Sequence, residues 1–317
     1  MLVWFPILIL TAYTHAQQSP AAAPAKSDSV ATDTDVGKDA SSAEELQKAT
    51  QNPVANLISV PIQNNANFGI GPYDRTQNVL NIQPVIPSHI SKDWMIISRI
   101  IQPIVWQPYP SDTTGGEFGF GDMNPTFFLS PAKPGKLIWG AGPALVIPTA
   151  TNDVLGQGKL SIGPSFVALA QPGHWTIGGL VNNVWSVAGS GGRPSVNQML
   201  FQYFLNYNMK KGYYVTLSPI ITADWTASSG NQWTVPVGGG LGRIMKLGFQ
   251  PVNITAQFYG NAAHPEGGSS WGMRLQIALL YPKFTKKQEM MMMEKKLQEM
   301  KEQKQGWTPG RWMTDDC

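Results

Sequence analysis

Charged and amide side chains inside otherwise apolar segments are the residues of this 317-residue chain that could do chemistry. An Arg or Lys that faces lipid at mid-depth of a membrane costs about 2–4 kcal/mol, so such residues are expected to face a polar interior. There they would either form a permeation constriction or pair with one another and fill the space. The candidate lumen-lining residues are Arg99, Asp122, Gln202, Asp224, Gln257, Arg274 and Gln276.

The segment 271–281 shows the pattern that would place such side chains in a wall between lipid and a polar lumen. Every second residue is apolar or aromatic, namely Trp271, Met273, Leu275, Ile277, Leu279 and Tyr281. The intervening residues are Gly272, Arg274, Gln276, Ala278 and Leu280. Ten strand residues at about 3.3 Å each, tilted by about 40°, cover roughly 25 Å of membrane. The segment therefore predicts the last strand of an outer-membrane β-barrel.

The rest of the chain between Pro53 and Phe284 divides into segments of strand length separated by turn residues. Their approximate spans are 57–70, 76–87, 92–106, 116–130, 136–149, 158–170, 174–187, 197–209, 213–226, 231–246, 249–261 and 270–284. Compact turns such as 210–212 alternate with longer loops such as 107–115, as periplasmic turns and external loops do. We predict an all-β fold: a closed antiparallel transmembrane β-barrel of about 12 strands over residues 53–284.

Aromatic residues mark both ends of several predicted strands. Trp94 with Trp106, and Trp175 with Trp185, share a parity, as two interfacial belts require. A water-soluble β-sandwich would also alternate, but it has no reason to place aromatic rings at both ends of its apolar faces. Arg99 has the parity opposite to Trp94, which is consistent with the lumen. Charged residues such as Arg243 that share the apolar parity must lie near the periplasmic interface or follow a bulge.

Seven prolines recur inside the predicted strands, each in a different strand. They are Pro84, Pro103, Pro125, Pro143, Pro164, Pro219 and Pro236. Proline lacks the N–H group that a strand ladder needs, so a closed barrel can hardly accommodate it in a regular strand. Their recurrence suggests bulges that bend the wall at one level.

The two ends of the chain have a different composition from the predicted barrel. Residues 1–16 resemble a secretory signal peptide, and 17–52 predict a flexible periplasmic leader. A capping-box pattern at 42–45 predicts a short helix near 43–50, which is either a plug of the barrel or a solvated linker helix. Residues 285–317 predict a partly helical periplasmic tail that packs as a helix or contacts a periplasmic partner.

Composition excludes several other classes of protein. Charged residues make up only 14% of the chain, and a formal charge of +3 is too small to indicate nucleic-acid binding. The single Cys317 excludes a disulfide framework within one chain and a multi-cysteine metal site. We expect no cofactor, no metal and no catalytic residues. The strongest enzymatic alternative is a barrel hydrolase that uses His264 with a serine of the same loop, although a polar loop explains these residues equally well.

Segments 52–61, 67–72, 78–87 and 119–122 resemble a recurrent bacterial group of outer-membrane proteins. They read NPVANLISVP, NFGIGP, NVLNIQPVIP and GFGD. That group is similar to the outer-membrane proteins linked to meta-pathway phenol degradation, and the resemblance covers residues 52–284. It implies a protein that admits hydrophobic or aromatic compounds, and it carries over no ligand residue.

These observations predict a channel or transporter in the outer membrane of a Gram-negative bacterium, for passive uptake of small molecules, aromatic or hydrophobic ones by the resemblance. Its expected partners are outer-membrane lipids, a small-molecule solute and the barrel assembly machinery, with no nucleic acid. The main alternative is a structural or adhesion barrel that acts through its loops or tail.

Overall fold

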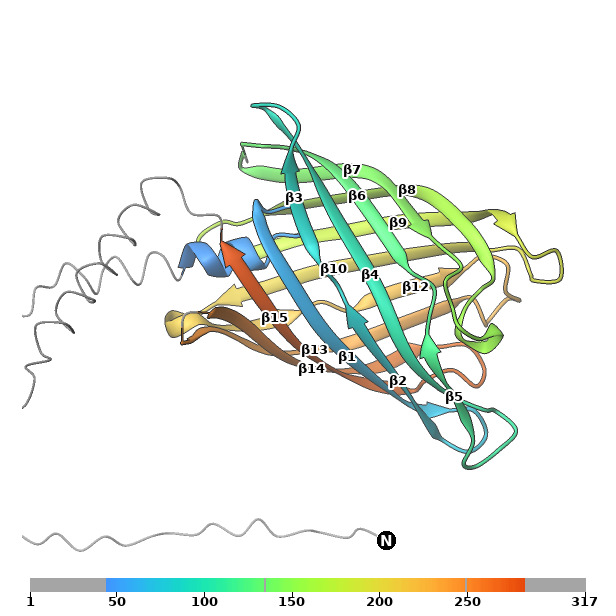
Figure 1. Cartoon of the computed structure of the whole chain (residues 1–317). Coiled ribbons are helices and arrows are strands. Elements are labelled where there is room, and N and C mark those ends of the chain that lie inside the picture. The colour runs from blue at the N-terminus through green and yellow to red at the C-terminus, as the bar shows by residue number, and fades with distance from the viewer. Residues whose placement is uncertain (1–43, 134, 249, 283–317) are drawn as a thin grey trace, which may run out of the picture.

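The strands of this protein form one antiparallel sheet that closes on itself. The computed structural model describes residues 44–133, 135–248 and 250–282. Each strand runs antiparallel to the strands beside it, and pairing of β9 with β10 and of β15 with β1 completes the ring (Figure 1). The strands are β1 (Leu57–Ile70), β2 (Arg75–Ile82), β3 (Val85–His89), β4 (Trp94–Pro108), β5 (Gly116–Phe120), β6 (Asn124–Pro131), β7 (Leu137–Val146), β8 (Lys159–Ala170), β9 (Trp175–Gly189), β10 (Asn197–Asn208), β11 (Tyr213–Leu217), β12 (Ile220–Asp224), β13 (Trp233–Leu247), β14 (Gln250–Ala263) and β15 (Trp271–Pro282). Two short 3₁₀ helices, η1 (Asp153–Leu155) and η2 (Lys210–Gly212), lie in the connections.

The prediction of a closed barrel of 12 strands is confirmed, with one difference in detail. Three strands of the wall are each interrupted, so that β2 with β3, β5 with β6, and β11 with β12 act as single strands. The register on β4 is the same on both sides of the first break, as Ile82 faces Gln102 and Val85 faces Arg99. At the second break it shifts by one residue. The predicted segments 76–87, 116–130 and 213–226 are therefore not continuous strands.

Several of the in-strand prolines lie at irregular places in the wall. Pro84 and Pro219 occupy the first and third breaks, because neither can donate an N–H to the neighbouring strand. Pro143 of β7 faces Pro164 of β8 in the register, and the ladder between β8 and β9 skips Pro164. Pro236 lies at a register shift between β13 and β14. The prolines thus mark interruptions as well as bulges.

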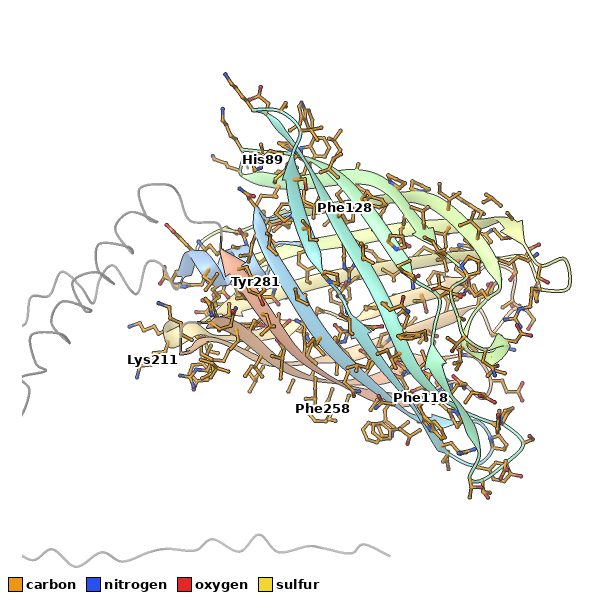
Figure 2. The ribbon with its side chains drawn as sticks, viewed as in Figure 1. His89, Phe118, Phe128, Lys211, Phe258 and Tyr281 are labelled. Atoms are coloured by element: carbon orange, nitrogen blue, oxygen red, sulfur yellow. The ribbon has the colours of Figure 1, made fainter. Side chains whose placement is uncertain are left out.

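The outer surface of the barrel is apolar. Phe118 and Phe258 are 70% and 57% exposed, and both point away from the wall (Figure 2). Aromatic rings lie at both ends: Trp175 packs against Tyr207 near the short turns, and Trp225 packs against Trp233 near the long loops, with centroids 4.8 and 5.3 Å apart. Apolar surface of this extent, bounded by two aromatic belts, is what a barrel immersed in lipid presents. No helix in the described part of the chain is long and apolar enough to span a membrane.

A short helix, residues 44–50, lies at the short-turn end of the barrel (Figure 1). Leu46 and Ala49 pack against buried residues of the wall, among them Leu280. Gln47 is 2% exposed and its Nε2 donates to Tyr213 O at 2.9 Å. Among the two interpretations of this helix, the structure therefore favours a docked element over a solvated linker.

After the helix, Val54 enters a cluster of inward-facing apolar side chains. It is 1% exposed and packs with Met95, Ile97, Phe128, Val167, Leu169, Leu180 and Phe204. The short-turn end of the lumen is therefore filled by residues 44–57 and the wall around them. The predicted signal segment 1–16, the leader as far as residue 43 and the tail 285–317 lie outside the described residues.

Candidate lumen site

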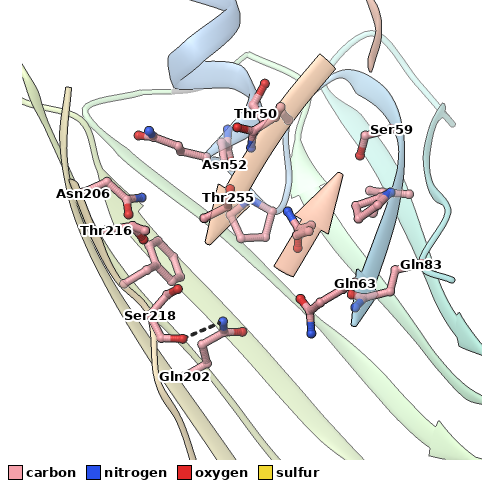
Figure 3. A pocket seen from close by; sticks show the side chains of 18 of the residues that line it. Thr50, Asn52, Ser59, Gln63, Gln83, Gln202, Asn206, Thr216, Ser218 and Thr255 are labelled. Carbon is pink, nitrogen blue, oxygen red and sulfur yellow. Dashed lines mark hydrogen bonds between the residues drawn. The ribbon is translucent and has the colours of Figure 1, made fainter. Parts of the chain in front are cut away.

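Above the segment 44–57 the lumen holds a polar cavity of about 200 Å³ (Figure 3). Thr50 and Asn52 border it on the side of the helix, and strand residues of β1, β3, β4, β9, β10, β11, β14 and β15 form its wall. Amide and hydroxyl groups dominate that wall, because inward positions of these strands carry Gln, Asn, Thr and Ser. The polar wall residues include Gln63, Gln83, Gln202, Asn206, Thr216, Ser218, Asn253, Thr255, Gln257 and Gln276.

A second cavity, of about 360 Å³, lies on the side of the long loops. Asn65, Thr222, Thr234 and Asn261 are among its lining residues. Arg274 lines both cavities. Its side chain thus separates the first cavity from the second.

Arg274 is held in this position by neutral acceptors from three other strands or breaks. Its Nε donates to Asn65 Oδ1 at 3.0 Å, and its Nη1 donates to Ser218 O at 3.0 Å. The same Nη1 lies 3.4 Å from Gln257 Oε1. The guanidinium also lies over the ring of Tyr259, 5.1 Å from the centroid. Ser218 can offer its carbonyl because it lies in the break between β11 and β12, where no ladder partner uses that group.

Arg99 faces the first cavity from β4. Its Nη2 donates to Gln83 Oε1 at 3.0 Å, and Gln83 lies in the break between β2 and β3. Arg99 and Arg274 line the same cavity. Arg99 therefore faces the lumen, as its strand parity predicted.

The three candidate glutamines also line the first cavity. Gln202 Nε2 lies 3.5 Å from Ser218 O (Figure 3), and Gln257 Nε2 donates to Ser218 Oγ at 2.7 Å. Gln276 lies two residues from Arg274 on the same face of β15. Gln202, Gln257 and Arg274 all bind Ser218, so one hydrogen-bonded group joins β10, β14 and β15.

The two candidate carboxylates occupy a different place, and neither lines either cavity. Asp122, 7% exposed, accepts from Ala150 N at 3.1 Å and Gln157 N at 2.6 Å. Asp224, at the end of β12, accepts from Thr226 N at 2.9 Å and from Gln198 Nε2 at 3.3 Å. Both carboxylates hold backbone at the long-loop end, which sequence parity does not distinguish from a lumen position.

Arg243 lies on the outer side of the wall near the end of β13. Its guanidinium carbon is 4.5 Å from the centroid of Tyr213, a ring that is 42% exposed. The pairing of Tyr213 with Arg243 places both next to the turn at 210–212. Arg243 is therefore an interfacial cation and not part of the lumen site.

The structure adds site residues that the sequence patterns did not single out. Tyr214 is 4% exposed, and its hydroxyl lies 2.8 Å from both Asn253 Oδ1 and Thr255 Oγ1. Gly242 makes room for this ring, since a Cβ there would lie 2.1 Å from Tyr214 Cζ. Inward parity alone could have found Tyr214, but only the closed barrel shows which residues it meets.

The loop proposed for a hydrolase shows no assembled nucleophile and base among the described residues. His264 Nδ1 contacts the neighbouring Pro265 O at 2.9 Å. The hydroxyls of Ser269 and Ser270 donate to Trp271 O and Phe68 O. No group of His, Cys, Asp or Glu in the described part of the chain could hold a metal ion.

No family model matches this chain, and no curated protein matches it. Among solved structures it is similar to an outer membrane channel from Pseudomonas putida F1, with 12% identity and a TM-score of 0.55 over 71% of this chain and 94% of that chain. The chain has the fold of that channel. Weaker similarities are to the CymD monoaromatic hydrocarbon channel, with 9% identity and a TM-score of 0.41 over 75% of this chain and 93% of that chain. The outer membrane phospholipase A of Escherichia coli matches with 12% identity and a TM-score of 0.38 over 72% and 97%. Only the first similarity is strong enough in its backbone to support the fold, and none of them assigns a function to this chain.

Proposed function

We propose that this protein is an outer-membrane channel for the passive uptake of small molecules. The observation that carries the proposal is the pair of polar cavities within a closed, lipid-compatible barrel, separated by the Arg274 side chain. A wall with an apolar exterior and a polar lumen permits solutes to cross without exposing backbone groups to lipid. The neighbour from Pseudomonas putida F1, described as an outer membrane channel, supports the same class of function.

The lumen favours selective passage over an open general pore. Residues 44–57 fill the short-turn end of the lumen, and the Arg274 side chain separates the two cavities. A solute therefore has to displace or pass these side chains, and a barrel of 12 strands leaves little width beside them. The solute is accordingly small, and the resemblance to phenol-pathway proteins points to aromatic or otherwise poorly soluble compounds.

Conductance in planar bilayers tests the proposal. We expect the folded, heat-modifiable protein to give discrete currents, and a variant without residues 17–52 to give larger ones. Absence of current from both proteins would remove the channel function and leave a barrel that acts through its loops or tail. We propose that the protein is not an enzyme. The His264→Ala variant and the unaltered protein are therefore expected to give the same result in a lipase assay.

A further inference from the structure

Two arginines face the same cavity without a carboxylate to neutralise them. Arg99 and Arg274 line the 200 Å³ cavity, and none of its other lining residues is acidic. The second cavity, which Arg274 also lines, has no acidic residue either. Within the described part of the chain the one ion pair joins Lys133 to Asp93 at 3.7 Å, in exposed turns. The lumen therefore carries two positive charges that the protein does not compensate.

Both guanidinium groups keep donors that are free to bind a ligand. Arg99 uses only Nη2, toward Gln83, among the described residues. Arg274 uses Nε and Nη1 and leaves Nη2 without a described acceptor. These unused nitrogens are not among the polar atoms buried out of reach of solvent, so they are open to the cavity. A guanidinium with free N–H groups in a cavity is a strong donor to an anionic oxygen.

Holding two cations close together costs free energy unless an opposite charge joins them. Neutral amide acceptors such as Gln83 and Asn65 satisfy individual donors, but they do not cancel the charge. Two like charges that line one cavity also repel each other. An anion between them would offset both terms, which no water molecule can do.

The apolar residues of the cavity wall indicate the rest of the ligand. Leu180 and Phe204, 3% and 7% exposed, belong to the apolar cluster around Val54 and also line the cavity. A ligand in this space therefore meets both cationic donors and apolar side chains. A cavity of about 200 Å³ is sufficient for a molecule with one aromatic ring or a short hydrocarbon chain.

We propose that the cavity between Arg99 and Arg274 binds the carboxylate of a small solute whose apolar body lies against Leu180 and Phe204. This inference rests on the proposed channel function and names its solute class: small carboxylates with an apolar body, of which aryl carboxylates are the simplest. The carboxylate accepts hydrogen bonds from the free guanidinium nitrogens, as planar fork donors permit. A neutral aromatic molecule of the same shape keeps the apolar contacts but lacks the negative charge.

Calorimetric titration of the full-length protein in detergent with benzoate and with benzamide tests the assignment. Benzamide has nearly the same shape and no charge. We expect benzoate to bind at least tenfold more tightly than benzamide, and Arg99→Gln and Arg274→Gln each to weaken benzoate binding about tenfold. Arg243→Gln is the matched control, since it removes an arginine from the outer side of the same barrel and should leave binding unchanged.

Equal binding of benzoate and benzamide would overturn the inference, and so would an equal loss in the Arg243 variant. Heat-modifiable migration identifies any variant that fails to fold, and the comparison of the two ligands on the unaltered protein still decides in that case. Sodium chloride and phosphate titrations separate a carboxylate site from general anion attraction, which would make benzoate and chloride equivalent and contradict the proposal. Benzoate binding without bilayer current would contradict the proposed channel function and support the carboxylate site. Bilayer current without benzoate binding would support the channel function and contradict the carboxylate site.

Discussion

One end of the lumen is filled by side chains, whereas the other end holds a cavity. At the short-turn end, residues 44–57 and the apolar cluster around Val54 close the space. At the long-loop end a cavity of about 360 Å³ remains, lined by groups such as Asn65, Thr222 and Asn261. Both ends belong to the same strands, so the difference arises from which residues occupy the inward positions at each level.

This comparison shows that inward parity does not by itself mean polar. On β4 the inward series runs Met95, Ile97 and Arg99, and it changes from apolar to charged where the docked segment ends. On β14 the inward residues Asn253, Thr255 and Gln257 are polar and buried. Apolar inward residues gather around Val54 at the filled end, and polar ones dominate the wall of the first cavity, which Leu180 and Phe204 also line.

The largest expected effect comes from placing a charge in the filled end. Val54→Asp would put a carboxylate into the cluster with Phe128, where an unpaired charge costs about 3–5 kcal/mol. The inserted segment should leave, and single-channel conductance should rise severalfold. Val154→Asp, at a residue that is 51% exposed, is the control. Unchanged conductance with unchanged thermal stability would show that the segment does not close the lumen.

A smaller effect, on the free energy of unfolding, is expected from a substitution where the filled end meets the polar cavity. Tyr214→Phe removes the hydroxyl shared by Asn253 and Thr255 and leaves buried polar atoms without that partner. The free energy of unfolding should fall by about 1–3 kcal/mol, measured by urea unfolding in detergent. Tyr213→Phe changes the neighbouring ring on the outer face and should change it by less than about 0.5 kcal/mol. Equal losses in the two variants would contradict the inside and outside assignment.

At the long-loop end the effect should be local. Asp122→Asn weakens the charge-assisted bonds to Ala150 N and Gln157 N and should cost about 1–2 kcal/mol. Limited proteolysis should then cut the loop 147–158 several times faster, while the barrel stays folded. Asp74→Asn is the control, because Asp74 has a φ of 49° that asparagine also accepts. Unaltered proteolysis would mean that the carboxylate does not anchor the loop.

The smallest effect concerns titration at the rim of the long loops. The hydrogen bond from Tyr109 to Glu117 raises the pKa of the Tyr109 phenol above its usual value of 10.0, because it stabilises the protonated form. This contact contributes below pH 10 and is lost as the pH rises through the raised value. Absorbance titration, with Tyr109→Phe to identify the signal, should show the midpoint falling in Glu117→Gln. A midpoint that does not move would place the two side chains apart.

Much of the fold could be predicted because its main signal is local. The alternation in 271–281 predicted the faces of β15, and the aromatic pairs predicted the two belts. The breaks at Pro84 and Pro219 were recognised as irregular, but their consequence was not predicted. A freed carbonyl at Ser218 becomes an acceptor for Arg274 only when the folded sheet brings β15 close to the break between β11 and β12.

Barrel formation and the direction of most side chains follow from the order of the amino acids alone, because strand parity depends only on neighbouring residues. The tertiary structure decided which inward groups meet, since Arg274 and Asn65 lie 209 residues apart and come together only when the sheet closes. It also separated Asp122 and Asp224 from the lumen arginines, because loops that fold back over the rim offered their N–H groups to those carboxylates. Closure thus left the two arginines without acidic partners, and that imbalance of charge is the basis of the proposed carboxylate site.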